Sequence, residues 1–167
     1  MESLQFLSAT EANCDEIYLM YLSAIDEMNK NGIFQWDSVY PNKKLIETDI
    51  KKGQMYVGRS GNELVSAYVI NVDCDVEYKN GNWKYPDAPY KIVHRLCVNP
   101  VFQNKGIAGQ TMLHIQDTLK QQGIGVIRLD AFTKNPYALR LYEKLGYEKV
   151  GFAEWRMGKF YLLEKKI

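Results

Sequence analysis

The sequence predicts a mixed α/β fold in which helices pack on the faces of a central β-sheet. Some segments repeat apolar residues at helical spacing, whereas others alternate or run continuously as strands do, so both element types are present. The β-like runs outnumber the helical ones and mostly follow one another directly. A chain of 167 residues with 46% hydrophobic content is long enough for one domain with a sizeable core.

The predicted elements follow the order β-α-α-β-β-β-α-β-α-β-β. Asn13 with Glu16 three residues later resembles a capping box that opens the first helix, and Asn31-Gly32 ends it. Asn42 caps the second helix. The expected strands are 4–9, 55–59, 64–72, 90–98, 124–131, 147–152 and 155–163, and the expected helices follow Asn13, cover 43–52, follow the glycines of 103–110 and follow Asn135-Pro136.

The composition narrows the classes of partner. Lys and Arg number 21 against 20 Asp and Glu, so the basic excess of a nucleic-acid-binding protein is missing. Cys14, Cys74 and Cys97 are an odd, widely spaced set, which argues against a disulfide framework and a thiolate metal site. No signal peptide or membrane-spanning run is present. We therefore expect a cytoplasmic protein without a metal, a membrane association or a nucleic-acid partner.

A glycine-rich junction at 103–110 predicts a phosphate site. It follows the strand over 90–98 and opens a helix, so it offers backbone N–H groups and the positive end of a helix dipole. The Gly-x4-Gly-Lys-Ser/Thr and Gly-x-Gly-x-x-Gly patterns of nucleotide-binding loops are both missing. The pattern found instead is Gln103-x-x-Gly106-x-Ala108, in the middle of the chain.

The region 93–151 contains three motifs in succession. They are a hydrophobic-x-Val-x-Pro lead-in at 96–100, a Gln/Arg-x-x-Gly-x-Gly/Ala loop at 103–108, and a helix with Asn135, Ala138, Leu141-Tyr142, Lys144 and Gly146-Tyr147. In these motifs and in their order, the region resembles the cofactor-binding half of the GNAT superfamily of N-acetyltransferases. Alanine at position 108 replaces the commoner glycine.

The resemblance implies a GNAT-like fold, with a mixed, mostly antiparallel central sheet of about seven strands flanked by about four helices. It implies a single N-acetyltransferase domain over 1–167, divided into an acceptor-side half (1–89), an acetyl-CoA-binding core (90–152) and a closing strand (153–167). The implied reaction transfers acetyl from acetyl-CoA to a primary amine of a small molecule or peptide, by direct attack in a ternary complex. A transferase for a longer acyl-CoA and a non-catalytic acyl-CoA sensor are the alternatives.

The resemblance also assigns the cofactor contacts. Gly106 has no side chain, so the pyrophosphate can approach its backbone, and the Lys105 side chain adds a positive charge. The backbone of 96–98 is expected to pair with the pantetheine arm, and the Val98 amide to polarise the thioester carbonyl. The implied cofactor-binding residues are Leu96, Cys97, Val98, Gln103, Asn104, Lys105, Gly106, Ile107, Ala108, Gly109, Gln110, Asn135 and Tyr142.

Acetyl transfer to an amine needs a general acid for the departing thiolate and a base for the amine. Tyr142 matches the family's usual acid, because a phenol with an unperturbed pKa of about 10 stays protonated at neutral pH. A purely core role for this tyrosine is the alternative. Cys97 lacks a His or Asp partner at catalytic spacing, so an acyl-cysteine route is not expected.

His94 is the first candidate base, because its side chain shares a strand face with Leu96 and Val98. A structural histidine is the alternative, with Asp75 or Glu77 acting through water. His114, in the middle of a helix, is expected to be structural or on the surface.

The acceptor-binding residues are expected in the two segments with the least regular pattern. The candidates are Phe34, Trp36, Tyr40 and Glu77. The aromatic loop at 33–41 is either a wall for the acceptor or a segment folded onto the core. The segment 73–89 is either a functional loop or a hairpin extension around Asn80-Gly81. An exposed edge strand near the carboxyl end allows a homodimer without requiring one.

Overall fold

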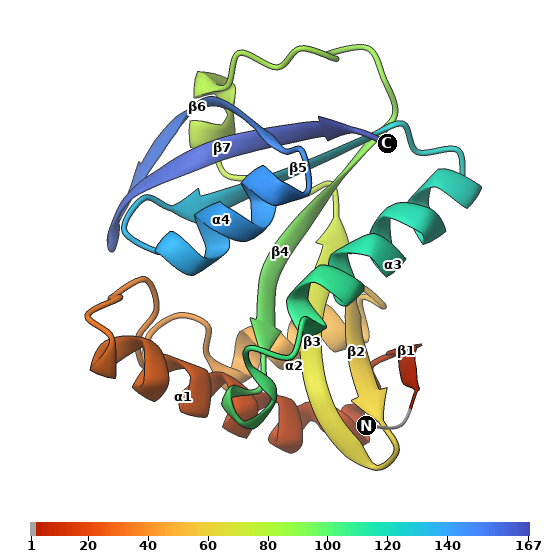
Figure 1. Cartoon of the computed structure of the whole chain (residues 1–167), viewed down its shortest axis with the longest axis vertical. Coiled ribbons are helices and arrows are strands. Elements are labelled where there is room, and N and C mark those ends of the chain that lie inside the picture. Colours follow the sequence, from red (N-terminus) through yellow and green to blue (C-terminus); the bar gives the residue numbers. More distant parts are fainter. Residues whose placement is uncertain (1–2) are drawn as a thin grey trace. The chain divides into compact units, whose positions relative to one another are not determined.

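The computed structural model describes residues 3–167, whose elements follow the predicted order (Figure 1). The strands are β1 (Leu4–Ser8), β2 (Met55–Ser60), β3 (Glu63–Asn71), β4 (Tyr90–Val98), β5 (Val126–Phe132), β6 (Glu148–Trp155) and β7 (Gly158–Lys166). The helices are α1 (Cys14–Lys30), α2 (Lys43–Lys51), α3 (Ile107–Gln121) and α4 (Pro136–Lys144), with short 3-10 turns η1 (Glu11–Asn13), η2 (Val76–Asn80) and η3 (Pro100–Phe102). Among these described residues the strands form one seven-stranded sheet of order β1-β2-β3-β4-β5-β7-β6, so the predicted fold class is confirmed.

The described chain divides into two compact units. The first unit contains Met1–Ile70 and Arg95–Thr111, and the second contains Asn71–His94 and Met112–Ile167. The assignment of 1–89 to the acceptor and 90–152 to the cofactor therefore stays a prediction, since these units follow contacts and not function.

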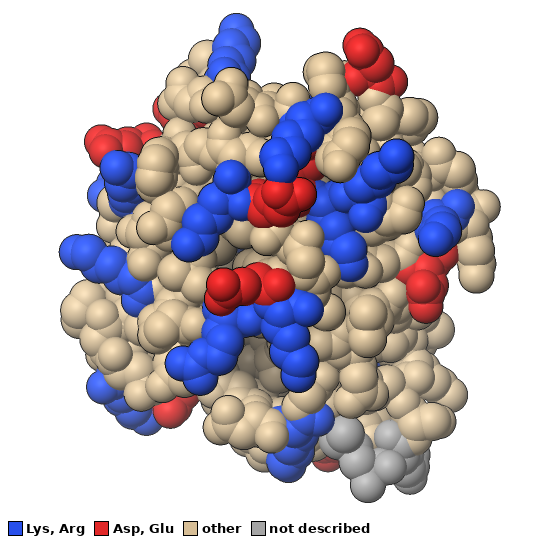
Figure 2. Space-filling model, turned by 45° about the horizontal axis from the view of Figure 1, so that its top comes forward, with Lys and Arg blue, Asp and Glu red and all other residues tan. Residues whose placement is uncertain are grey.

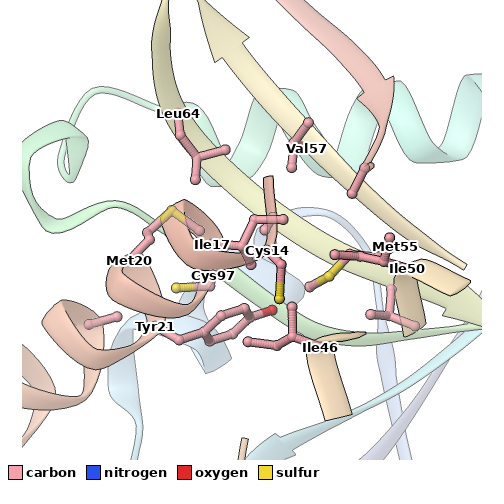
Figure 3. Packing of buried hydrophobic residues seen from close by; sticks show 14 of the residues in the cluster. Cys14, Ile17, Met20, Tyr21, Ile46, Ile50, Met55, Val57, Leu64 and Cys97 are labelled. Atoms are coloured by element: carbon pink, nitrogen blue, oxygen red, sulfur yellow. The ribbon is translucent and has the colours of Figure 1, made fainter. Parts of the chain in front are cut away.

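The core of the first unit lies between α1, α2 and the antiparallel strands β2 and β3 (Figure 3). Ile17, Tyr21 and Ala24 of α1 are buried at spacings of four and three residues, which places them on one face of the helix. The expected capping box is different in detail. The Asn13 side-chain oxygen accepts from the Thr10 N–H at 2.9 Å, so it closes η1 and does not cap α1. Glu16 forms an ion pair with Arg59 instead.

Helix α2 begins at the predicted cap, because the Asn42 side chain accepts a 2.9 Å hydrogen bond from the Leu45 N–H. Its buried face consists of Ile46, Asp49 and Ile50. A carboxylate on such a face needs a partner, because an unpaired buried charge is strongly unfavourable.

The second unit is built on antiparallel pairs of β5 with β7 and of β7 with β6. The start of β4 joins it, because Tyr90–Ile92 pairs with Val126–Arg128 of β5 in parallel. Helix α4 belongs to the same unit. Its N-terminus has the predicted Asn135-Pro136 start.

The segment 73–89 is not a hairpin extension. It forms η2 and is then attached to the strands of the second unit. The Trp83 Nε1–H donates to the Tyr78 carbonyl at 2.9 Å, and the Lys84 N–H donates to Glu164 at 2.7 Å. Arg128 pairs with Glu164 at 3.0 Å and places its guanidinium 4.4 Å from the Trp83 ring centre. These contacts hold the segment 73–89 against strands β5 and β7 of the second unit.

Charge and helix length bear on the kinds of partner. Figure 2 shows Lys and Arg interspersed with Asp and Glu on the face that it presents. Within residues 3–167, none of the helices has the length and apolar character needed to cross a bilayer.

Candidate active site

Strand β4 changes its backbone conformation at Arg95. Its φ of 50° lies in the left-handed region, which costs a non-glycine residue about 1–2 kcal/mol. The Arg95 carbonyl accepts a 2.5 Å hydrogen bond from the Tyr21 hydroxyl, and its guanidinium forms an ion pair with Asp49. Its Nη1 also donates to the Tyr40 hydroxyl at 3.0 Å. Helices α1 and α2 and the segment between them therefore hold this point of the chain.

The sequence analysis did not identify this cluster. Asp49 carried a usable signal, because it shares a helical face with Ile46 and Ile50, where a charge implies a buried partner. Arg95 carried none, since nothing in a strand pattern marks a left-handed residue that is not glycine or asparagine.

The chain leaves β4 through a fixed turn at Asn99. The Asn99 N–H donates to the Val65 carbonyl and its side-chain amide donates to the Leu64 carbonyl, both at 2.9 Å. Its side-chain oxygen accepts from the Val101 N–H at 3.2 Å, which starts η3. The turn is thereby anchored to β3, and the loop that follows begins from a rigid support.

The predicted phosphate loop has two left-handed residues, Asn104 with φ 60° and Gly106 with φ 76°. Such residues direct successive backbone N–H groups to one side and form a concave site for anions. Residues 103–106 are exposed, whereas Ile107 is buried and begins α3. The Thr111 and Ser66 hydroxyls, 3.2 Å apart, join α3 to β3. The loop therefore lies at the anchored N-terminus of α3, whose first N–H groups have no acceptor within the helix.

The glycine at 106 is required by its conformation and not by crowding. A Cβ atom there would meet only the Gln110 side-chain nitrogen, at 3.7 Å. The Lys105 ammonium donates to the Val101 carbonyl at 3.2 Å and lies 4.9 Å from the Phe102 ring centre. Its positive charge thus stays beside the loop.

Residues 96–98 complete β4, beyond the parallel register with β5, which covers Tyr90–Ile92. Leu96 and Val98 are partly buried, and Cys97 is buried. Burial raises the pKa of the Cys97 thiol to about 12, so the thiol is protonated at neutral pH and is a poor nucleophile.

In the second unit, Asn135 caps α4, because its side chain accepts from the Ala138 N–H at 3.1 Å. Tyr142 is 7% exposed, and its ring packs edge-on against Tyr147, with centroids 5.6 Å apart. Burial, and then the negative charge of Asp130, raises the pKa of Tyr142 well above its ordinary value. The phenol is consequently protonated throughout the physiological range.

His94 lies in the second unit with Asn71, whose role the sequence did not indicate. The His94 Nε2 is 2.8 Å from the Asn71 side-chain oxygen. Because an amide oxygen only accepts, Nε2 carries a proton in this contact. His114 lies 3.4 Å from the Thr118 hydroxyl on α3, in keeping with the expected structural role.

The predicted acceptor residues differ in exposure. Trp36 is 9% exposed, and its ring centre lies 5.5 Å from that of Tyr21, so this ring packs into the core. Phe34 is 57% exposed and Tyr40 is 38% exposed. Glu77 is partly buried on η2 in the second unit. The first unit thus brings Tyr40 to β4 through Arg95, while Phe34 faces solvent.

Comparison with known proteins gives the family. The model of the acetyltransferase (GNAT) family matches residues 23–147. An S-(2-succino)cysteine N-acetyltransferase from Bacillus subtilis (strain 168) is 20% identical over 162 residues, 95% of this chain and 92% of that protein. A GNAT-family acetyltransferase structure from Streptococcus agalactiae 2603 has a TM-score of 0.84 at 26% identity, covering 98% of this chain and 95% of the other. The PaiA N-acetyltransferase from Thermoplasma acidophilum in complex with coenzyme A has a TM-score of 0.73 at 14% identity, covering 99% of each chain.

Proposed function

The chain belongs to the acetyltransferase (GNAT) family, and we propose that it transfers acetyl from acetyl-CoA to a primary amine by direct attack within a ternary complex. The acceptor is a small molecule or a peptide. One observation carries the proposal: the loop 103–110, inside the family-matched region, has two left-handed residues directly before a long helix. This geometry suits the pyrophosphate of coenzyme A.

Within the loop 103–110, the pyrophosphate binds to the backbone N–H groups of 105–109, since those of Gln103 and Gln110 already donate to the Pro100 and Gly106 carbonyls. The two left-handed residues turn these donors outward, the dipole of α3 adds a partial positive charge, and Lys105 supplies a full one. A side chain at 106 would separate the phosphate oxygens from the backbone, which explains the glycine chemically as well as conformationally.

The pantetheine arm runs along residues 96–98, pairing with the backbone as an added strand does. Support comes from the register of β4, whose pairing with β5 stops at Ile92. The Val98 amide then donates to the thioester oxygen, where negative charge develops as the amine attacks.

In the reaction, the amine lone pair bonds to the thioester carbonyl carbon and charge moves to the oxygen. The carbonyl then re-forms, the C–S bond breaks, and the thiolate takes a proton from Tyr142. The raised pKa of Tyr142 keeps the phenol protonated, so that it can donate a hydrogen bond to the departing sulfur. A base accepts the proton that the attacking amine loses, so one proton is removed from the amine and one is delivered to the thiolate.

We assign that base to His94. The Asn71 oxygen, 2.8 Å from Nε2, holds the imidazole in one orientation, and an imidazole has its ordinary pKa in the working range of a general base. Glu77 on η2, acting through water, is the second candidate. The low reactivity of the buried Cys97 favours direct attack over an acyl-cysteine intermediate.

We assign the acceptor contacts to the exposed rings of Phe34 and Tyr40 in the first unit and to Glu77 in the second. Trp36 supports the segment that carries the two rings through its packing in the core. Because a relative is named for S-(2-succino)cysteine, this amino acid belongs among the amines to be tested.

The test has two stages. Acetyl-CoA at about 100 times its dissociation constant should raise the free energy of unfolding by about 2.7 kcal/mol. A panel of amines, including S-(2-succino)cysteine, aryl-alkyl amines and short peptides, is then assayed for release of free thiol. A chain that acetyl-CoA does not stabilise is not a transferase of this kind. If acetyl-CoA stabilises the chain but no amine causes thiol release, the non-catalytic sensor is favoured. If the chain reacts better with a longer acyl-CoA than with acetyl-CoA, a transferase for that longer acyl group is favoured.

We also propose a cytoplasmic location, in which Cys14, Cys74 and Cys97 stay reduced as the free thiols found in the structure. The edge strand β6 is the place where a second copy would pair, and the mass of the chain in solution tests this.

A further inference from the structure

Arg95 directly precedes the residues to which the proposed function assigns the pantetheine arm. A left-handed residue in a strand turns the peptides after it, so the φ of 50° sets the direction of the amides of 96–98. Relaxation of Arg95 towards the ordinary β conformation would turn these amides away. Since arginine does not favour this conformation by itself, surrounding contacts must maintain it.

The contact that acts on the backbone itself comes from Tyr21. Its hydroxyl donates to the Arg95 carbonyl at 2.5 Å, and its side chain is completely buried against Trp36. Burial raises the pKa of Tyr21 well above its ordinary value, so the hydroxyl remains a donor at every working pH. The Tyr21 hydroxyl is therefore fixed in position by packing and stays protonated.

The Arg95 side chain is held at a cost in free energy. Its exposed fraction is 10% and that of its ion-pair partner Asp49 is 7%. Within the described part of the chain, the buried Arg95 Nε has no hydrogen-bond partner. A buried ion pair with an unsatisfied donor is a poor source of stability, because an apolar pair of the same size would avoid the desolvation. This arrangement points to a role in geometry.

Tyr40 connects the same guanidinium to the surface. Its hydroxyl accepts from Arg95 Nη1 at 3.0 Å, and its ring centre lies 5.7 Å from the guanidinium carbon. Tyr40 is 38% exposed, and its neighbour Val39 is 60% exposed, as is Phe34 at 57%. A molecule that contacts Tyr40 therefore touches a residue one hydrogen bond away from the distorted point of β4.

We propose that Arg95 is a positioning residue that joins the acceptor-side segment 33–42 to the strand that carries the acetyl-CoA arm. Tyr21 fixes its backbone, Asp49 fixes its side chain, and Tyr40 transmits contact with the acceptor. The inference rests on the proposed function and adds to it the residues that set the amides of 96–98. These amides bind the pantetheine arm, whereas the 103–110 loop binds the pyrophosphate independently of Arg95.

The test compares two ligands by calorimetry: acetyl-CoA, and the nucleotide fragment of coenzyme A without the pantetheine arm (3′-phospho-ADP). Tyr21→Phe and Tyr40→Phe each remove one hydroxyl and keep the ring, so both variants should fold. Tyr68→Phe is the matched control, because Tyr68 is 2% exposed in the same unit and stacks on Tyr56 with centroids 5.5 Å apart.

Loss of one hydrogen bond should raise the acetyl-CoA dissociation constant about three- to tenfold in the Tyr21 variant and somewhat less in the Tyr40 variant. The dissociation constant of the fragment should stay within about twofold, and Tyr68→Phe should change neither. Because both hydroxyls act through Arg95, the double variant should lose less than the product of the single effects.

Three results would overturn the inference. Equal weakening of acetyl-CoA and fragment binding would indicate a general structural defect. Unchanged acetyl-CoA affinity in both variants would show that the two hydroxyls do not act on the amides of 96–98. Selective loss of acetyl-CoA affinity in Tyr68→Phe would show that the effect is not specific to the contacts of Arg95. An unaltered chain that binds neither ligand would refute the proposed function first and this inference with it. An unaltered chain that binds both, with unselective variants, would refute only the inference.

Discussion

Replacement of Gly106 by alanine separates the conformational role of this residue from its role towards a ligand. The added Cβ has room in the protein, because the nearest atom is the Gln110 side-chain nitrogen at 3.7 Å. Its cost in the free protein therefore comes from the φ of 76° alone, which is about 1 kcal/mol of unfolding free energy. Any larger effect on cofactor affinity must come from the ligand itself.

Gly123 provides the matched control. It ends α3 with a φ of 78°, and a Cβ there would meet nothing within 4 Å. Gly123→Ala and Gly106→Ala should thus lose about the same 1 kcal/mol in urea unfolding. In calorimetry with coenzyme A, the Gly106 variant should bind at least about tenfold more weakly, or 1.4 kcal/mol, whereas the Gly123 variant should bind as the unaltered chain does.

Equal coenzyme A affinity in the two variants would refute the placement of the pyrophosphate at 103–110. A much larger stability loss at 106 than at 123 would refute the premise that conformation is its whole cost in the free protein. Both outcomes are measurable with the same two preparations.

Three further predictions concern the acid, the buried phenols and the thiols. Tyr142→Phe should lower turnover in the thiol-release assay at least about a hundredfold while the acetyl-CoA dissociation constant stays within about twofold; equal losses would remove its role as acid. The pKa values of Tyr21, Tyr142 and Tyr147 are raised mainly by burial, so folding favours their protonated forms. Stability should be intact below the unfolded pKa of about 10 and fall above it by about 1.4 kcal/mol per pH unit for each phenol, and urea titrations at about pH 9 and pH 11 measure this. Thiol labelling of the native chain at about pH 8 should modify the exposed Cys74 faster than the buried Cys14 and Cys97, which should react only on unfolding. The Cys97→Ala variant should keep the turnover of the unaltered chain, and complete loss of turnover in this variant would restore the covalent route.

Local pattern predicted most of the elements, because their causes are local. Strand β4 has the predicted bounds of 90–98, since a continuous apolar run between breakers leaves few alternatives. Helices α2 and α4 begin at the predicted asparagine caps, whose hydrogen bonds reach only three residues along the chain. The glycine-rich loop was recognisable for the same reason, because its conformation depends on its own residues.

The features that the sequence did not predict depend on distant pairs. Arg95 is held by Asp49, 46 residues away, and by Tyr21, 74 residues away, and no periodicity encodes such contacts. Likewise, Asn80-Gly81 allowed a hairpin, but hydrogen bonds from Tyr78 to Asp130 and from Lys84 to Glu164 attach the segment elsewhere. Asn13 was mispredicted although its contacts are local. Its side chain could cap α1 or accept from Thr10, and in the structure it accepts from the Thr10 N–H.

The segment that bears the predicted acceptor residues is preformed, and this affects which acceptors suit it. The Asp37 side chain accepts from the Val39 N–H at 3.0 Å and from the Tyr40 N–H at 3.1 Å, so the turn closes on itself. Trp36 anchors the segment in the core, which leaves Phe34 and Tyr40 exposed on a rigid support. Binding there requires little ordering of the chain, so affinity should follow the ligand's apolar area and charge. Amines with an aromatic or aliphatic group beside the reacting nitrogen should therefore bind better than small hydrophilic amines, and Phe34→Ala should narrow that difference.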